Sequence, residues 1–213
     1  MTMSPRLKTL FVILGGLLVA IVIAVWPRSD PQLDRMEATT AASEGNQPRL
    51  AALLARDPAI AGEVHQTSRI GLLHLAARSG SPETIRLVLA AGAPKAADID
   101  GRTPLHHLFF NARGDAERGR VQESAEMLLA AGIELQAVDV LGSTVLHMAS
   151  ARSNPALALW LVQKKADPNV RDKQGYTPLD YALRVGATVA AKALAQAGFP
   201  RGAYQPPPEP AAR

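Results

Sequence analysis

The segment TPLHHLFFNA at residues 103–112 decides how the chain folds, because related segments recur along the sequence. Thr followed by Pro and then by apolar residues is typical of a helix start, with Thr as the N-cap and Pro in the first turn. The related segments are GLLHLAARSG at 71–80, TVLHMASARS at 144–153 and TPLDYALRVG at 177–186. Each is followed by a second apolar stretch that favours a helix: TIRLVLAAGA, SAEMLLAAGI, LALWLVQKKA and AAKALAQAGF. The sequence therefore predicts four helix pairs.

The spacing of the pairs indicates one repeating unit. The anchor positions of the four segments lie 32, 41 and 33 residues apart, and they are His74, His106, His147 and Asp180. Gly92 lies 18 positions after the anchor His74, whereas Gly132 lies 26 positions after the anchor His106. The longer interval therefore holds eight extra residues, and they lie between the two helices of that pair. A fifth, degenerate unit precedes these at residues 39–58, TTAASEGNQPRLAALLARDP.

This pattern resembles the ankyrin repeat, which reads Asp-x-x-Gly-x-Thr-Pro-Leu-His-x-Ala-Ala, then a second helix, then Gly-Ala-Asp-x-Asn. The best matches are DIDGRTPLHH at 98–107, DKQGYTPLDYA at 172–182 and KADPN at 165–169. The resemblance covers about residues 36–199 and implies an all-α fold: an ankyrin-repeat solenoid made of a degenerate N-terminal cap repeat plus four repeats, over residues 33–202. One such unit cannot bury its apolar face alone, so stability comes from stacking.

Three positions depart from the pattern. Lys165 stands where the other repeats have a glycine after the second helix, a position that requires a left-handed backbone. Arg69 interrupts the turn of the first full repeat, and Asp180 replaces the anchor histidine in the last one. We expect weaker packing at these points and an unchanged fold.

The N-terminus carries an apolar run without charge, LFVILGGLLVAIVIAVW, from Leu10 to Trp26. Its 17 residues reach the short end of the length that spans a bilayer. Arg6 and Lys8 precede it, and no small-residue cleavage site follows. We predict one transmembrane signal anchor at residues 9–26, a cytoplasmic N-terminus at 1–8 and a short linker at 27–32. A cleaved signal peptide is the alternative.

The positive-inside rule places the repeats on the exported side of the membrane. Because the composition is rich in Ala and Arg and lacks Cys, we expect a bacterial inner-membrane protein with a periplasmic repeat domain. The C-terminal residues 203–213, AYQPPPEPAAR, predict a disordered Pro-rich tail, with a ligand for a Pro-recognition domain as the alternative.

Composition and motifs argue against several classes of function. The net charge is +4, but without Arg6 and Lys8 the chain has 21 basic against 19 acidic residues, so we expect no nucleic acid as partner. Phosphate loops, nucleophile elbows and HExxH motifs are absent from the sequence. The recurrent histidines are expected to bond within their own turns. We therefore expect no catalytic residue, metal, cofactor or small-molecule substrate.

The ankyrin resemblance implies binding of a protein through the finger tips and the concave face of the first helices. Exposed apolar groups and arginines are typical of interaction surfaces. The predicted partner-binding residues are Ile99, Asp100, Arg102, Phe110, Asn111, Val140, Leu141, Arg152, Lys173, Tyr176 and Arg184.

Since Arg78, Arg102, Arg152 and Arg184 would line this face without matching acids, we expect a partner with an acidic and apolar surface. The inserted segment at 113–120 would extend or gate the contact. The function predicted from the sequence is thus a membrane-tethered, periplasm-facing protein-binding scaffold. The alternative function is an immunity protein that neutralises a secreted toxin by occluding its active site. An enzyme is the third possibility, which an activity screen would test.

Overall fold

A computed structural model of the chain describes residues 8–14, 17–23, 30–111, 118–152 and 155–205. The chain divides into two compact units, Met1–Glu37 and Ala38–Arg213, which are described separately.

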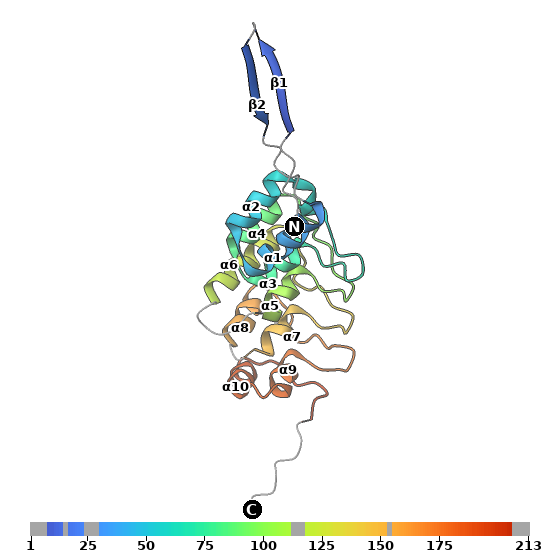
Figure 1. Cartoon of the computed structure of the whole chain (residues 1–213). Coiled ribbons are helices and arrows are strands. Elements are labelled where there is room, and N and C mark those ends of the chain that lie inside the picture. Colours follow the sequence, from blue (N-terminus) through green and yellow to red (C-terminus); the bar gives the residue numbers. More distant parts are fainter. Residues whose placement is uncertain (1–7, 15–16, 24–29, 112–117, 153–154, 206–213) are drawn as a thin grey trace, which may run out of the picture. The chain divides into compact units, whose positions relative to one another are not determined.

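The first unit contains two short strands where the sequence predicted a membrane-spanning helix. Strand β1 (Lys8–Leu14) pairs antiparallel with β2 (Leu17–Ile23), and the register places Lys8 opposite Ile23 and Leu14 opposite Leu17 (Figure 1). In the described part of the chain, no helix is long and apolar enough to cross a membrane. The helix prediction at residues 9–26 therefore differs from the structure.

The physical reason for this difference lies in the composition of the run. A segment that is apolar throughout has no periodicity to separate a helix from a strand. Val and Ile, which favour strands, make up much of the run.

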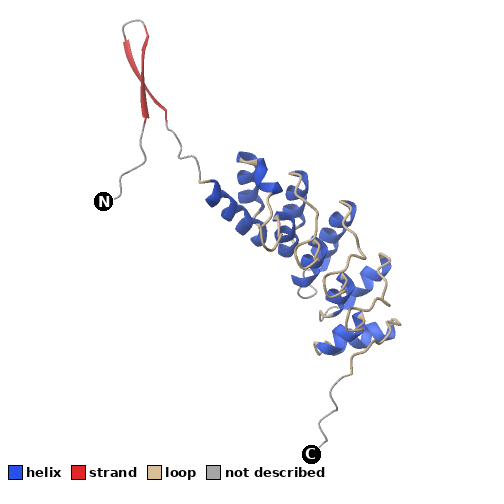
Figure 2. Cartoon of the chain, turned by 90° about the vertical axis from the view of Figure 1, so that its right-hand side faces the viewer, coloured by secondary structure: helices blue, strands red, loops and turns tan. Residues whose placement is uncertain are grey.

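From Pro31 onward the long elements of the described residues are helices, as predicted, and they come in pairs (Figures 1 and 2). The pairs are α1 (Pro31–Glu44) with α2 (Gln47–Arg56), α3 (Leu72–Ser79) with α4 (Pro82–Ala90), α5 (Pro104–Asn111) with α6 (Arg118–Ala130), α7 (Val145–Ser150) with α8 (Pro155–Gln163), and α9 (Pro178–Arg184) with α10 (Thr188–Gln196). A short 3-10 helix, η1 (Pro58–Gly62), follows α2. The five pairs correspond to the degenerate unit and the four repeats read from the sequence.

The core runs through the stack from one pair to the next. First helices contact first helices, α3 with α5, α5 with α7 and α7 with α9. Small residues such as Ala76, Ala77 and Ala149 are fully buried at these contacts, and Phe109 is the largest fully buried side chain. The buried residues of all pairs form one cluster, as expected when each unit buries its apolar face against its neighbours.

Three turns precede the first helices of the last three repeats, at residues 98–102, 139–143 and 172–176; we call them the fingers. Each begins with an aspartate whose Oδ1 accepts two backbone N–H groups of its own finger at 2.8–2.9 Å. Backbone hydrogen bonds also connect successive fingers: Val140 donates to Asp100 and Lys173 donates to Leu141, both at 2.8 Å. The fingers thus form one continuous, rigid edge of the stack.

The anchor histidines tie each helix to the next finger. His106 accepts the backbone N–H of Thr103 on Nδ1 at 3.2 Å, and its Nε2 donates to the carbonyl of Ser143 at 3.2 Å. His74 and His147 repeat both bonds. The expectation that these histidines bond within their own turns is met by this geometry, and the second bond adds a link between repeats.

The irregular positions are accommodated without a change of fold. Lys165 (φ 76°) and Arg69 (φ 56°) both adopt the left-handed conformation of the glycines that they replace. Part of the insertion in the third pair is helical, because α6 has 13 residues where α4 and α8 have nine. The rest of the predicted loop, 112–117, lies outside the described residues.

The predicted C-terminal tail also lies mostly outside the described residues, which end at 205. Its first residues contact the last finger: the backbone N–H of Ala203 donates to Gly175 at 3.1 Å, and the ring of Tyr204 lies edge-on to Tyr176.

Candidate protein-binding groove

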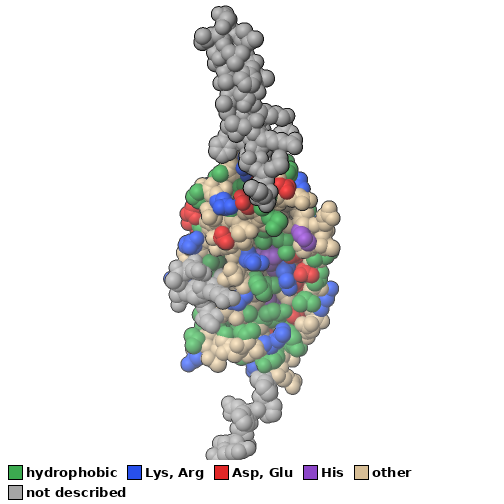
Figure 3. All heavy atoms as spheres, viewed as in Figure 1, with side chains coloured by type: hydrophobic (Ala, Val, Ile, Leu, Met, Phe, Trp, Pro, Cys, Tyr) green, Lys and Arg blue, Asp and Glu red, His purple; other side chains and the backbone are tan. Residues whose placement is uncertain are grey.

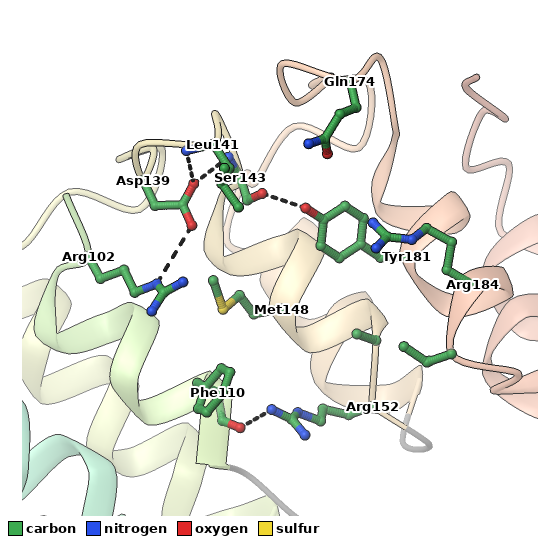
Figure 4. A pocket seen from close by; sticks show the side chains of 12 residues that line it. Arg102, Phe110, Asp139, Leu141, Ser143, Met148, Arg152, Gln174, Tyr181 and Arg184 are labelled. Carbon is green, nitrogen blue, oxygen red and sulfur yellow. Dashed lines mark hydrogen bonds and ion pairs between the residues drawn. The ribbon is translucent and has the colours of Figure 1, made fainter. Parts of the chain in front are cut away.

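A groove of about 430 Å³ opens between α5, α7, α9 and the fingers beside them (Figure 4). Five of the predicted partner-binding residues line it together: Arg102, Phe110, Leu141, Arg152 and Arg184. In the space-filling view, hydrophobic side chains with Lys and Arg among them gather over this part of the stack (Figure 3). Repeats of the chain thus bring residues from 102 to 184 to one surface.

Three apolar side chains of the groove are exposed to solvent, those of Phe110, Leu141 and Val185. Phe110, the penultimate residue of α5, is 55% exposed, and Leu141, at the tip of its finger, is 43% exposed. The half-buried Met148 of α7 lies between them on the groove wall (Figure 4). Large apolar groups exposed in one groove are typical of surfaces that bind another molecule.

The arginines of this face have partners within the chain, which differs from the expectation of unmatched positive charge. Arg102 Nη1 lies 3.4 Å from Asp100 Oδ2, and Arg102 Nε lies 3.7 Å from Asp139 Oδ2. The sequence did not indicate the second contact, because Asp139 belongs to the next finger along the stack. The charge at Arg102 is therefore largely balanced.

The other two arginines of the groove contact aromatic rings. Arg152 donates to the carbonyl of Phe110, and its guanidinium lies over the Phe110 ring at 5.3 Å from the ring centroid. Arg184 lies over the rings of Tyr176 and Tyr181 at 5.0 and 5.3 Å. These contacts hold the guanidinium groups in place at the groove.

A polar network closes the finger side of the groove. The hydroxyl of Tyr181 donates to Asp172 Oδ2 at 2.9 Å and lies 2.6 Å from Ser143 Oγ (Figure 4). Burial raises the pKa of Tyr181, and its hydrogen bond to the Asp172 carboxylate raises it too. Tyr181 is therefore a neutral, fixed hydrogen-bonding group at neutral pH.

The remaining predicted residues do not line the groove. Ile99 and Val140 are exposed at the finger tips, at 58% and 49%, with Asp100 and Lys173 beside them. Asn111 lies at the end of α5 and donates to the carbonyl of Arg78 at 2.9 Å. Tyr176 is half-buried in the last finger. The tip residues share the edge that the connected fingers form.

Several groove residues were not predicted from the sequence. They are Asp139, Met148 and Tyr181, whereas Ser143, Ala151, Gln174 and Val185 belong to the finger and first-helix rows where the sequence predicted the binding face. A usable signal existed for two of them: Met148 and Tyr181 each directly follow an anchor position, as His107 does. The structure shows that this position faces the aspartate of the finger, since His107 Nε2 lies 2.8 Å from Asp98 Oδ2.

The recurrent histidines are buried and uncharged at neutral pH. Desolvation by burial lowers the pKa of His74 to about 4, and the neighbouring His107 lowers it further. Burial likewise lowers the pKa of His106 and His147. Among the described residues, no group of three or more His, Cys, Asp or Glu side chains is arranged to hold a metal ion.

Comparison with known proteins agrees with the repeat architecture. Residues 128–182 match a family model described as ankyrin repeats in many copies. The chain is 30% identical over 173 residues to the E3 ubiquitin-protein ligase XB3 of Oryza sativa subsp. japonica, covering 78% of this chain and 38% of that protein. It is 34% identical over 120 residues to ankyrin repeat and SOCS box protein 16 of Mus musculus, covering 56% of this chain and 26% of the relative.

A third relative shows the same partial coverage. The chain is 31% identical over 176 residues to Rabankyrin-5 of Homo sapiens, covering 67% of this chain and 15% of the relative. This chain thus spans less than half the length of each of these three relatives.

Proposed function

We propose that this chain, whose residues 128–182 match a model of ankyrin repeats, binds a partner protein in the groove between α5, α7 and α9. One observation carries this proposal: Phe110 and Leu141 are both exposed in one groove, whose arginine side chains are held in place by contacts within the chain. Preorganised groups lose little conformational entropy on binding.

The partner that fits this groove has an apolar side chain at its centre and acidic groups around it. Burial of Phe110 or Leu141 would contribute roughly 1.5–3 kcal/mol each when complete. The guanidinium groups of Arg152 and Arg184 would attract carboxylates of the partner, which speeds association at low salt. Arg102 contributes less to this attraction because Asp100 and Asp139 lie beside it.

The proposal is tested by crosslinking in the cell. A photoreactive residue is placed at Phe110 of the full chain, and crosslinked proteins are identified by mass spectrometry. The same residue at Lys192, exposed on the second helix α10, is the matched control. We expect a product at Phe110 that is absent at Lys192 and that Leu141→Ala reduces. A product that forms equally at both positions, or that Leu141→Ala leaves unchanged, would place the binding surface elsewhere.

We also propose that residues 9–26 attach the chain to the bacterial inner membrane, with the N-terminus in the cytoplasm and the repeats in the periplasm. The support is the uncharged run Leu10–Trp26 and the preceding Arg6 and Lys8. The proposal requires residues 9–26 to be helical in the membrane, because the open edges of the two-stranded sheet of β1 and β2 would leave backbone groups unpaired in hydrocarbon.

Membrane attachment is tested by alkaline extraction and by reporter fusions. We expect the full chain to stay with the membrane at high pH, and a C-terminal fusion to be active only with a reporter that works in the periplasm. A chain that is released by alkali is not integrally attached, and a fusion that is active only in the cytoplasm reverses the orientation.

A further inference from the structure

The groove lies where a row of large side chains along the stack is interrupted. The residue four positions after the anchor is Arg78, Phe110, Ala151 and Arg184 in the four successive repeats. Equivalent positions of a solenoid form rows, and the last three of these residues line the groove. Phe110 and Arg184 are large and exposed, whereas Ala151, between them in the row, has only a methyl group. The row therefore has a gap at the repeat of α7.

A second row is interrupted at the same repeat. The residue directly after the anchor is His107 in α5, Met148 in α7 and Tyr181 in α9. The rings of His107 and Tyr181 reach from the helix to the finger, because they contact the finger aspartates at 2.8 and 2.9 Å. Met148 has no ring and is half-buried on the groove wall. The groove of about 430 Å³ thus opens where the row of large residues is reduced to a methyl group and the row of rings to a thioether.

The gap has room for one large side chain. Helix α7 packs against α5 on one side and against α9 on the other, and packed helices lie about 8–10 Å apart. Two such steps separate the row members Phe110 and Arg184, and only Ala151 stands between them. Because Ala151 and Met148 are half-buried rather than buried, a side chain from outside can reach both. A side chain that enters over Ala151 takes the place of the missing row member.

Contacts within the chain hold the walls of the gap in place (Figure 4). On the α5 side, Arg152 donates to the carbonyl of Phe110, and its guanidinium lies 5.3 Å from the centroid of the Phe110 ring. On the α9 side, the hydroxyl of Tyr181 donates to Asp172 at 2.9 Å, and Arg184 lies over the Tyr181 ring. Binding in the gap therefore costs little conformational entropy, because these groups are already fixed.

The side chains around the gap favour an aromatic ring. The rings of Phe110 and Tyr181 can meet a further ring edge-on or offset, which adds to the free energy gained from apolar burial alone. The sulfur of Met148 makes favourable contacts with ring edges, and the guanidinium of Arg184 is attracted to ring faces. An aliphatic side chain of similar size would gain only the apolar burial. An aromatic side chain therefore fits the gap better than an aliphatic one.

We propose that the groove takes one aromatic side chain of the partner protein, inserted over Ala151 between Phe110 and Tyr181. Ala151 and Met148 are the residues that determine this specificity, because a larger residue at 151 or a ring at 148 would fill the gap from within the chain. This inference rests on the proposed function and adds the chemical class of the side chain that is bound.

Substitutions of Ala151 test the inference without touching the walls of the gap. Ala151 has φ −69° and ψ −6°, a conformation open to larger residues, and its backbone N–H donates to the carbonyl of His147 whatever the side chain. Ala151→Phe fills the gap, Ala151→Leu is a smaller filling in case the first variant does not fold, and Ala151→Ser is the matched control that leaves the gap open. The probe is a library of short random peptides displayed on phage, selected on the full-length chain in detergent.

We expect the parent chain and Ala151→Ser to select peptides that share an aromatic residue. Ala151→Phe and Ala151→Leu should lose this preference and melt no lower than the parent. In fluorescence anisotropy with the parent chain, replacing the aromatic residue of a selected peptide by Ala should weaken binding about tenfold or more, and replacing it by Leu about threefold or more. On the filled variants the three peptides should bind within about twofold of one another.

The inference is overturned if the parent selects peptides without an aromatic residue, if no peptide is selected, or if the Leu peptide binds as tightly as the aromatic one. It is also overturned if a filled variant that melts like the parent keeps the aromatic preference, because the ring would then bind outside the gap. Crosslinking at Phe110 that persists in these cases leaves the proposed function standing, whereas loss of that crosslink specificity removes the proposed function itself.

Discussion

Replacement of Lys165 by Gly should stabilise the stack. Lys165 has φ 76°, while Gly92, Gly132 and Gly198 have φ 79°, 90° and 83° at the equivalent position of other repeats. A left-handed conformation costs a residue with a Cβ about 1–2 kcal/mol. Glycine loses about 0.5–1 kcal/mol more backbone entropy on folding than alanine does. The difference gives an expected gain of up to about 1 kcal/mol.

The structure indicates that no other term should offset this gain. The Lys165 side chain is exposed. Its backbone N–H donates to the carbonyl of Val162 at 2.8 Å, and its carbonyl accepts from the Gln136 side-chain amide at 2.8 Å, so neither bond depends on the lysine side chain. The reverse substitution is the matched control: at Gly132 an added Cβ would meet no atom within 4 Å, so Gly132→Ala changes only the backbone energy.

Urea unfolding followed by circular dichroism measures both effects. Lys165→Gly should raise the free energy of unfolding by up to about 1 kcal/mol, equivalent to roughly 2–4 °C in melting temperature for a domain of this size, and Gly132→Ala should lower it by a similar amount. If Lys165→Gly is less stable than the parent while Gly132→Ala is destabilised as expected, the left-handed strain assigned to Lys165 is wrong.

Two further predictions follow from buried contacts. The pKa of His74 is about 4 in the folded chain and 6.5 in an unfolded chain. As the pH falls through this interval the unfolded state binds a proton before the folded state does, so the free energy of unfolding decreases. At about 1.4 kcal/mol per pKa unit, this one group lowers the free energy of unfolding by about 3 kcal/mol. Urea unfolding from pH 7 to 4 should show the decline, and His74→Gln should show a shallower one; an equally steep decline would contradict the assignment. Gly202→Ala should cost about 1–3 kcal/mol, because a Cβ there would contact the Asp180 carboxylate and lie 2.5 Å from the carbonyl of Gly175, whereas Gly62→Ala, which meets nothing within 4 Å, should be neutral. Equal melting temperatures for these two variants would show that the segment after α10 does not pack as described.

The sequence by itself determined the repeat architecture, because the repeat pattern is local. The Thr-Pro starts, the anchor histidines and the interval near 33 residues predicted the helix pairs. Lys165 was also predicted to occupy a left-handed position, and its φ of 76° confirms this. Equivalent positions of a solenoid form rows, which is why five of the predicted binding residues line one groove. The N-terminal run was assigned wrongly in its secondary structure, because a uniformly apolar segment lacks the periodicity that distinguishes a helix from a strand.

Only the tertiary structure decided which polar atoms of the groove have a hydrogen-bond or ion-pair partner within the chain. The sequence shows Arg102 as a positive charge, but the stacking of two fingers places its Nε 3.7 Å from the carboxylate of Asp139. Likewise, the sequence shows Met148 only as an apolar residue of a repeat. At the equivalent positions Tyr181 and His107 contact the aspartates of their fingers, and only this comparison in space shows that Met148 offers Asp139 no such hydrogen bond. Hydrogen-bond satisfaction depends on angstrom-scale contacts between residues of different repeats, and those distances are set by the packing of the whole stack rather than by any local pattern.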